Sequence, residues 1–399
     1  MQNIRNITED IIYLGANDRK LGLFEAVYPV SGVNYNSYLI NDDKTILMDT
    51  VDKRVKEQFF ENLEYALNGK ALDYLIVQHM EPDHCALIEE VVNKYPNVKV
   101  VTSAKAAEMI KQFFNFDIDS HLQIVKEGDT LKTKNHELTF VAAPMVHWPE
   151  VIVTYDTVTK TLFSADAFGS FGAYSGNIFD DEIDFTNYFD EARRYYTNIV
   201  GKYGAQVQAL LKKASNLEIK MICPLHGVIV RKHIVEYVEK YLKWSSYTPE
   251  KQGVVIAYSS IYGNTENVAN ILANKLAIKG VKDIKMYDTS MTHYSYILAD
   301  AFKYSHVVLA TTTYNMGVFV TMEHFIHNIV THNLQNRKYV IIQNGSWAIN
   351  CEKSIKEQLE KLKGSEFIAN SFNVKSAIKN NQMEDIDNLA CEIVKSLNS

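Results

Sequence analysis

Four side chains that can bind a metal ion fall close together in this sequence. His79, Glu81, Asp83 and His84 lie in the stretch His-Met-Glu-Pro-Asp-His, directly after the apolar run DYLIVQ. In an extended loop, residues two apart point to the same side, so His79 and Glu81 can bind one ion while Asp83 and His84 bind another. A lone histidine is more often structural than a ligand, but four ligand-type residues at this spacing predict a metal site.

Three further candidate ligands each follow another β-type run. His147 comes after residues 138–144, Asp166 ends residues 160–166, and His226 ends residues 220–226. We expect each of them on a loop at the end of a strand. The complete set of four histidines and three carboxylates can hold two metal ions: His79, Glu81, Asp83, His84, His147, Asp166 and His226.

The layout resembles that of the metallo-β-lactamase superfamily, whose common motif HxHxDH holds two zinc ions for hydrolysis. Here Glu81 stands where that motif has its second histidine. A carboxylate adds negative charge and a hard oxygen ligand, which favours a metal that cycles between the +2 and +3 states. Histidine–carboxylate sets of this kind suit non-haem iron, so we predict two iron ions.

Other histidines and the cysteines are not predicted to bind a metal. His324, His327 and His332 lie on a predicted helix without a carboxylate at matching spacing, which is typical of a solvated helix face. The four cysteines show no CxxC spacing. They therefore predict neither a disulfide framework nor a zinc or iron–sulfur knuckle.

A loop in the second half of the chain has the features of a phosphate site. The run GVVIAYS predicts a buried strand that ends in a loop of hydroxyl and small residues before a helix near 265–279. A helix N-terminus offers free backbone N–H groups and a positive dipole end. Neither GxxxxGK[ST] nor GxGxxG is present, so a single phosphate of flavin mononucleotide (FMN) fits better than ATP or a dinucleotide. The candidate contacts are Ser260, Ile261, Tyr262, Gly263, Asn264 and Thr265.

Two more loops at predicted strand ends complete a flavin site. Open α/β sheets bind ligands at the carboxyl ends of their strands. Tyr314 and Trp347 can flank a flat isoalloxazine ring, and neighbouring Asn, Thr and Gly residues can hydrogen-bond its polar edge. The candidate contacts in these loops are Thr312, Thr313, Tyr314, Asn315, Gly317, Asn344, Gly345, Ser346 and Trp347.

The elements that must position these residues change in pattern near residue 248. Before it, short β-type runs are mixed with helical stretches at 53–68, 86–95 and 187–214, which predicts a layered α/β domain. The polar stretch SSYTPEKQG then predicts a linker. After it, five strands alternate with helices, the pattern of a doubly wound parallel sheet. We predict a metal-binding domain in residues 1–248 and an FMN-binding domain in residues 249–399.

Composition limits the class of protein. The chain has 399 residues, 47% of them apolar and 22% charged, which is typical of a globular protein with sizeable cores. Its net charge of −7 argues against a nucleic-acid-binding surface. No apolar run is long enough for a membrane helix, and the first residues lack the apolar centre of a signal peptide. We expect a cytoplasmic protein that does not bind membranes.

Taken together, the motifs HMEPDH, MVHWP, SADAFG, RRYYTNI, CPLHGVIVR and YSSIYGNT resemble the flavodiiron protein family, also called A-type flavoproteins. The resemblance covers essentially the whole chain. It implies a metallo-β-lactamase-like αββα sandwich followed by a flavodoxin-like doubly wound sheet, with FMN and a non-haem diiron centre. It also implies reduction of O₂ to water, of NO to N₂O, or both, in defence against oxidative and nitrosative stress.

The resemblance assigns roles to individual residues. One iron would be bound by His79, Glu81 and His147, the other by Asp83, His84 and His226, with Asp166 as the bridge. The stretch RRYYTNI would place Tyr195 or Tyr196 near the open side of the iron pair. This chain departs from the family pattern at three places. Glu25 stands where a histidine is common, Cys85-Ala86 follows the metal motif where SG is common, and the loop SWAIN stands where relatives read like GWSGG.

The resemblance also implies partners. A head-to-tail homodimer, or a dimer of dimers, would bring the flavin of one subunit to the iron of the other. Because the sequence contains no CxxC motif for a rubredoxin domain, we expect the electrons to come from a separate rubredoxin-like protein or a reduced cofactor.

Parts of the sequence are compatible with two other functions. The first is a dizinc hydrolase with an accessory flavodoxin domain, against which Glu81 argues. The second is an electron carrier or scaffold whose metal site only stabilises the fold. A structural metal site is usually closed, with four ligands per ion, whereas seven ligands over two ions leave positions open.

Overall fold

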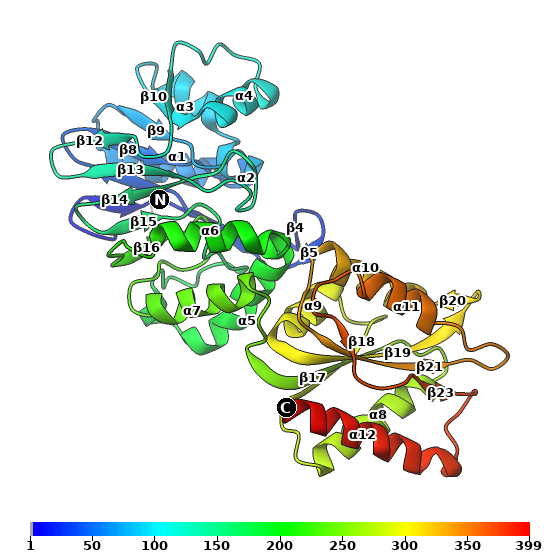
Figure 1. Cartoon of the computed structure of the whole chain (residues 1–399). Coiled ribbons are helices and arrows are strands. Elements are labelled where there is room, and N and C mark those ends of the chain that lie inside the picture. Colours follow the sequence, from blue (N-terminus) through cyan, green and yellow to red (C-terminus); the bar gives the residue numbers. More distant parts are fainter. Residues whose placement is uncertain (1–2) are drawn as a thin grey trace. The chain divides into compact units, whose positions relative to one another are not determined.

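The structure is a computed structural model that describes residues 3–399. The chain divides into two compact units (Figure 1). The first consists of Met1–Tyr196 with Ala205–Tyr241, and the second of Thr197–Gly204 with Leu242–Ser399. The predicted boundary at residue 248 lies between helix α7 (Ile234–Ser245) and strand β17 (Lys251–Tyr258).

Two main sheets build the first unit. The seven-stranded sheet has the order β1-β2-β7-β8-β9-β10-β11, and the five-stranded sheet has the order β12-β13-β14-β15-β16. The strands of the first sheet are β1 (Arg5–Asn6), β2 (Ile11–Tyr13), β7 (Tyr38–Asn41), β8 (Thr45–Met48), β9 (Tyr74–Ile76), β10 (Lys99–Ser103) and β11 (Leu122–Val125). Those of the second are β12 (Thr130–Lys132), β13 (Glu137–Ala142), β14 (Ile152–Asp156), β15 (Thr161–Phe163) and β16 (Met221–Cys223).

Two short antiparallel strand pairs and seven helices complete the described part of the first unit. The pairs join β3 (Ala16–Asp18) to β6 (Val33–Tyr35) and β4 (Leu23–Phe24) to β5 (Tyr28–Pro29). Besides α7, the helices are α1 (Lys56–Leu67), α2 (Pro82–Cys85), α3 (Ile88–Lys94), α4 (Ala104–Phe113), α5 (Phe185–Tyr195) and α6 (Gly204–Ala214). Strands such as β8 are buried along their whole length, which explains their continuous apolar sequence.

The second unit is one doubly wound sheet with helices on both faces. Its strand order is β18-β17-β19-β21-β22, and β20 and β23 pair with β19 and β21. The strands are β17, β18 (Ile284–Asp288), β19 (Tyr304–Tyr314), β20 (Gly317–Val318), β21 (Lys338–Asn344), β22 (Glu366–Phe367) and β23 (Phe372–Val374). The helices are α8 (Asn264–Ile278), α9 (Tyr294–Lys303), α10 (Val320–Thr331), α11 (Glu352–Leu359) and α12 (Met383–Leu397).

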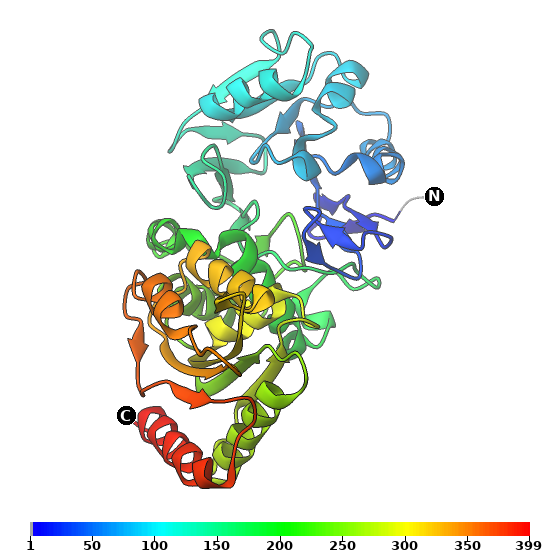
Figure 2. The same cartoon turned by 90° about the vertical axis from the view of Figure 1, so that its right-hand side faces the viewer.

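The core of this unit shows why its helices are amphipathic. Helices α8 and α12 lie side by side on one face of the sheet (Figures 1 and 2), where Leu272 and Leu389 pack against Val308 and Ile342. Helices α9 and α10 contact each other and β19 on the opposite face. The prediction of an αββα sandwich followed by a doubly wound parallel sheet is confirmed.

The stretch 187–214 differs from the single helix that its pattern predicts. Helix α5 ends at Tyr195, a π-helical turn covers Tyr196–Val200, a 3₁₀ turn covers Gly201–Tyr203, and only then does α6 begin. Gly204 permits this break, because a Cβ at that position would lie 2.3 Å from the carbonyl oxygen of Ser245. The close approach depends on a contact distant in sequence, which periodicity does not reveal.

Candidate metal centre and flavin cavity

All seven candidate metal ligands lie in the connecting segments that follow strands β9, β13, β15 and β16. His79 follows β9, Asp166 follows β15 and His226 follows β16, while His147 lies in the loop between β13 and β14. Glu81 is the N-cap residue of α2, and Pro82 begins that short helix, the position at which proline is best tolerated. Asp83 and His84 therefore project from a helical turn rather than from the extended loop that the sequence predicts.

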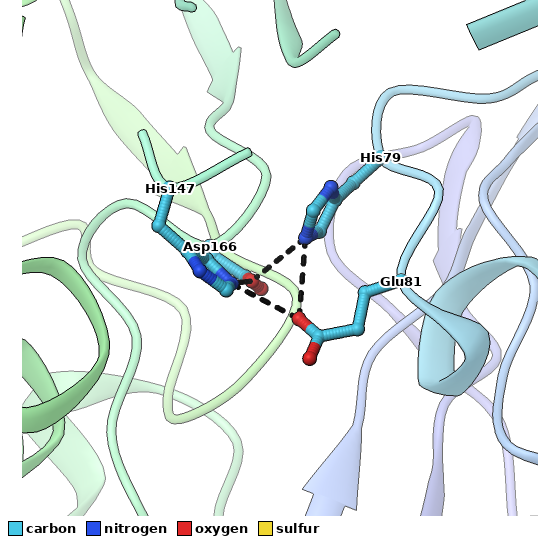
Figure 3. A group of neighbouring side chains, drawn as sticks. All are labelled: His79, Glu81, His147 and Asp166. Carbon is cyan, nitrogen blue, oxygen red and sulfur yellow. Dashed lines mark hydrogen bonds and ion pairs between the residues drawn. The ribbon is translucent and has the colours of Figure 1, made fainter. Parts of the chain in front are cut away.

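The first group of ligands consists of His79, Glu81, His147 and Asp166, whose ligand atoms all lie within 4.8 Å of one another (Figure 3). The Nε2 atoms of His79 and His147 lie 3.3 and 3.0 Å from Glu81 Oε2. The same two nitrogens lie 3.3 and 3.2 Å from Asp166 Oδ2. Four ligand atoms thus surround one position.

The second group consists of Asp83, His84 and His226. His226 Nε2 lies 3.2 Å from Asp83 Oδ2, and His84 Nε2 lies 3.5 Å from Asp83 Oδ1. Asp166 also faces this group, because its Oδ1 lies 3.2 Å from His84 Nε2 and 3.9 Å from His226 Nε2. One oxygen of Asp166 faces each group, which is the arrangement that a bridging carboxylate needs.

The donor atoms fit two cations. Both carboxylate oxygens of Asp83 and Asp166 are buried without a hydrogen-bond partner, as are the Nε2 atoms of His84 and His226. Burying such groups is costly unless they are paired or coordinate a metal. Burial lowers the pKa of His147, but Asp166 and Glu81 outweigh this effect and raise its pKa to about 9. A bound cation would take the place of that proton.

Glu150 is a functional candidate that the sequence analysis missed. Its Oε1 lies 2.8 Å from His79 Nδ1 and also accepts a hydrogen bond of 2.9 Å from the backbone N–H of Met80. A carboxylate on the far ring nitrogen of a metal-binding histidine fixes its tautomer and orientation. The backbone carbonyl of Asn34 does the same for His226, at 2.8 Å from Nδ1. Neither contact has a local sequence signal, although an acidic residue between apolar neighbours marks Glu150.

The two candidate tyrosines occupy different surroundings. The ring of Tyr195 lies 5.6 Å from that of His226, and its buried hydroxyl has no hydrogen-bond partner. Burial, together with the charge of Asp166, raises the pKa of Tyr195 well above its usual value. Tyr196 instead packs edge-on against Tyr241, with ring centroids 5.0 Å apart. Tyr195 thus contacts a candidate ligand, while Tyr196 contacts Tyr241.

The predicted flavin loops line one cavity of about 650 Å³ in the second unit. Thirteen of the fifteen predicted contacts belong to its lining, and Gly263 and Gly317 do not. Met316, Ala348 and Ser376 also line it, although the sequence analysis did not select them. The lining follows β17, β19, β21 and β23, so the cavity lies at the carboxyl end of the sheet.

The cavity fits a phosphate at one side. Gly263 caps α8 with a φ of 85°, a conformation that glycine adopts readily. The first turn of α8 contains Thr265, whose Oγ1 accepts a hydrogen bond of 3.2 Å from Asn344 Nδ2. Ser260 Oγ and Asn344 Oδ1 are buried without a partner, so polar atoms remain available for a ligand.

Aromatic side chains stand at the mouth of the same cavity. Trp347 and Tyr262 are both 90% exposed and Tyr314 is 48% exposed. Monomeric proteins seldom expose several large aromatic residues around one cavity unless it is a binding site. A flat ring system such as isoalloxazine is a ligand that these side chains can cover.

Comparisons with known proteins agree with this division. Residues 33–227 match the family model described as ODP family beta lactamase, and residues 256–387 match the model for flavodoxin. The chain is 31% identical to a nitric oxide reductase of Moorella thermoacetica, over 90% of each protein. The structure of rubredoxin oxygen:oxidoreductase from Desulfovibrio gigas superposes with a TM-score of 0.91 at 28% identity, covering 99% of this chain and 98% of that one. A flavodiiron protein of Giardia intestinalis shares the fold, with a TM-score of 0.91, 22% identity and the same coverage.

A β-lactamase-like domain with two adjoining groups of candidate metal ligands, followed by a flavodoxin domain, defines the class of flavin-linked diiron proteins. The chain belongs to the flavodiiron protein family. The predicted cofactors, FMN and a diiron centre, are those of this family, and the donor atoms described above fit them. Within residues 3–399, no helix is long and apolar enough to cross a membrane.

Proposed function

We propose that this protein is an oxidoreductase that passes electrons from FMN to a diiron centre and reduces O₂, NO or both. The observation that carries the proposal is Asp166, whose two oxygens face two groups of ligands. The relatives named nitric oxide reductase and rubredoxin oxygen:oxidoreductase support this chemistry. The dizinc hydrolase alternative is not favoured.

In this function the seven ligands divide as the two groups do. His79, Glu81 and His147 would hold one iron and Asp83, His84 and His226 the other, with Asp166 facing both groups. When bound, FMN and the iron pair supply the electron transfer and the gas-reducing chemistry. Glu150 keeps the Nδ1 proton on His79, so that Nε2 presents its lone pair to the metal.

Tyr195 is the proposed hydrogen-bond donor beside the iron pair. Its raised pKa keeps the phenol protonated at neutral pH, and a buried hydroxyl without a partner can donate to a substrate atom. We expect Tyr195→Phe to slow NO or O₂ reduction while iron content stays unchanged. The matched control is Tyr196→Phe, because Tyr196 packs against Tyr241 instead. Equal rates in the wild type and in Tyr195→Phe would exclude the role.

We further propose that residues 1–248 form the diiron domain and residues 249–399 the FMN domain. Residues 251–397 contain the strands and helices around the flavin cavity, so the fragment 249–399 should fold and bind FMN alone. A folded fragment that fails to bind FMN in a fluorescence titration would contradict this division.

The proposed assembly is a head-to-tail homodimer, alone or as a dimer of dimers, with a rubredoxin-like protein or a reduced cofactor as the electron donor. The name of the Desulfovibrio gigas protein supports a rubredoxin donor, and free cysteines at all four positions fit a reducing cytoplasm. A C₂ dimer would create two equivalent flavin–iron pairs.

Complementation tests the assembly. One chain carries Asp83→Ala and His84→Ala, and the other carries substitutions of Asn264 and Thr265, so that neither homodimer is active. In a mixed dimer, the intact flavin site of the first chain would serve the intact metal site of the second. An inactive but folded and correctly loaded mixed dimer would contradict electron transfer between subunits.

A further inference from the structure

Asn350 joins the two loops that carry Tyr314 and Trp347. Its side-chain amide donates a hydrogen bond of 3.1 Å to the backbone carbonyl of Met316. Its backbone N–H donates a second, also 3.1 Å long, to Thr313 Oγ1. Asn350 is not part of the cavity lining, so it links the loops from outside the cavity.

The loop that receives these bonds has an unfavourable backbone. Tyr314 pairs with Gly317 across the turn between β19 and β20, which leaves Asn315 and Met316 as the two turn residues. Their φ angles are 48° and 62°, as in the turns that suit two-residue hairpins but usually contain glycine. Asparagine tolerates this region, whereas methionine pays a steric cost. The Asn350 amide thus hydrogen-bonds the backbone of Met316, the turn residue whose side chain makes this conformation unfavourable.

The backbone next to Asn350 is anchored to the sheet. The next backbone N–H, that of Cys351, donates a bond of 2.9 Å to Gln343 Oε1 on β21. At the start of the loop, a Cβ on Gly345 would lie 1.7 Å from the carbonyl oxygen of Ala348, so the turn closes tightly on itself. The segment from Gly345 to Cys351 therefore has a defined shape, in the very stretch where SWAIN departs from the family pattern.

We propose that Asn350 is a positioning residue that holds both flavin loops in their binding conformation before FMN arrives. Loops that are already ordered lose less conformational freedom when the ligand binds, and affinity rises accordingly. Asn350 thus acts through the placement of Tyr314 and Trp347 and does not touch the cofactor. The inference rests on the proposed function, in which this cavity binds FMN.

The experiment uses the full chain freed of FMN. Asn350→Asp keeps the size of the side chain but replaces the amide donor by a carboxylate, and Asn350→Ala removes it. Asn370→Asp is the matched control, because Asn370 is an exposed residue of the same unit outside the flavin cavity. We expect the Kd for FMN to rise about tenfold in both Asn350 variants, mainly through slower association, and to stay unchanged in the control.

Amide hydrogen exchange provides the second measurement. In the Asn350 variants without FMN, residues 314–318 and 346–351 should exchange faster than in the wild type, and saturating FMN should restore wild-type exchange. A merely structural role would leave exchange fast in the FMN-bound state as well.

Three outcomes would overturn the proposal. Unchanged affinity and exchange in both variants would show that the link has no effect on binding. A large fall in the unfolding temperature of the FMN-free variants, absent from the control, would assign Asn350 to the stability of the fold. Wild-type protein that does not bind FMN would refute the proposed function itself, whereas wild-type binding with unaffected variants would refute only the role of Asn350.

Discussion

The metal centre and the flavin cavity create binding sites by opposite means. Six of the seven candidate ligands are buried, and their charged and imidazole groups face one another directly. The flavin cavity is formed by backbone turns, hydroxyl groups and exposed aromatic rings. The comparison indicates that the metal centre depends on the identity of single side chains, while the cavity depends on the shape of its loops.

A carboxylate–histidine cluster elsewhere in the first unit sharpens this contrast. His136 Nδ1 lies 2.6 Å from Asp156 Oδ2, and its Nε2 lies 2.9 Å from Asp10 Oδ2. Both ring nitrogens therefore have a protein partner, whereas the Nε2 atoms of His84 and His226 lack a hydrogen-bond partner. The same residue types form a structural contact in one place and a candidate metal site in the other, and the difference lies in which atoms remain unpaired.

The largest effect is expected for Asp166→Asn. The substitution keeps the size of the side chain but removes the negative charge that faces both groups of candidate metal ligands. We expect iron content to fall from ~2 per chain to below ~1 and the rate of reduction to fall by on the order of 100-fold or more, with FMN binding unchanged. Metal analysis and flavin content check this. Full iron loading in the variant would show that Asp166 does not bridge the two groups.

Glu150→Gln should have a smaller effect on the same centre. The amide can still accept a hydrogen bond from His79 Nδ1, but it lacks the charge that strengthens that bond. Loss of such a partner typically weakens metal binding by about 10- to 100-fold, which competition with a chelator would measure. An unchanged metal affinity would mean that burial alone orients His79.

Thr265→Val tests the cavity without touching the metal centre. Removing a hydroxyl that hydrogen-bonds a charged phosphate costs roughly 1–3 kcal/mol, so FMN should bind about 5- to 150-fold more weakly. Iron content should not change. Wild-type FMN affinity would indicate that Thr265 contributes only its hydrogen bond with Asn344.

The smallest expected effect is a pH-dependent change in the free energy of unfolding when His136 is replaced. Burial lowers the pKa of His136, but Asp156 and Asp10 outweigh it and raise that pKa above its usual value. A raised histidine pKa stabilises the fold fully below the unfolded-state value of about 6.5, and this contribution is lost as pH rises through the folded-state pKa. The pKa of Asp156 is lowered, so the stability that its charged form contributes is lost as the pH falls through that pKa. The contribution of the His136–Asp156 pair to the free energy of unfolding therefore falls in acid as well.

His136→Asn should therefore lower the free energy of unfolding by about 1–2 kcal/mol near pH 6 and by less at pH 9. Denaturant titrations of the metal-free chain at the two pH values measure the difference. The same loss at both values would show that the histidine stabilises the fold by packing and not by its charge.

Sequence alone predicted those features that depend on local spacing. The stretch from His79 to His84 predicts a metal site because its ligand types lie close together in the chain, and the strand-end positions of His147, Asp166 and His226 follow from the general position of sites in layered folds. The sequence predicts a phosphate loop on the same ground, because a glycine and hydroxyl residues precede a helix.

Features that depend on distant contacts could not be predicted. Glu150 reaches His79 across 71 residues. Ser376 joins the flavin cavity because β23 pairs with β21, and the extra turn after Tyr195 depends on the approach of Ser245 to Gly204. Each is fixed by tertiary packing, which leaves no periodic signal in the chain.

The most direct test of the central claim is gas consumption by the iron-loaded holoprotein. Protein prepared anaerobically with ample iron and FMN is supplied with the same reduced rubredoxin, and NO and O₂ consumption are measured in parallel against zinc-loaded protein. The account predicts ~2 irons and ~1 FMN per chain, as the two metal groups and one cavity imply, with rapid consumption of at least one gas and none by the zinc form. Preferential uptake of zinc under these conditions, with neither gas reduced after iron is added, would contradict it.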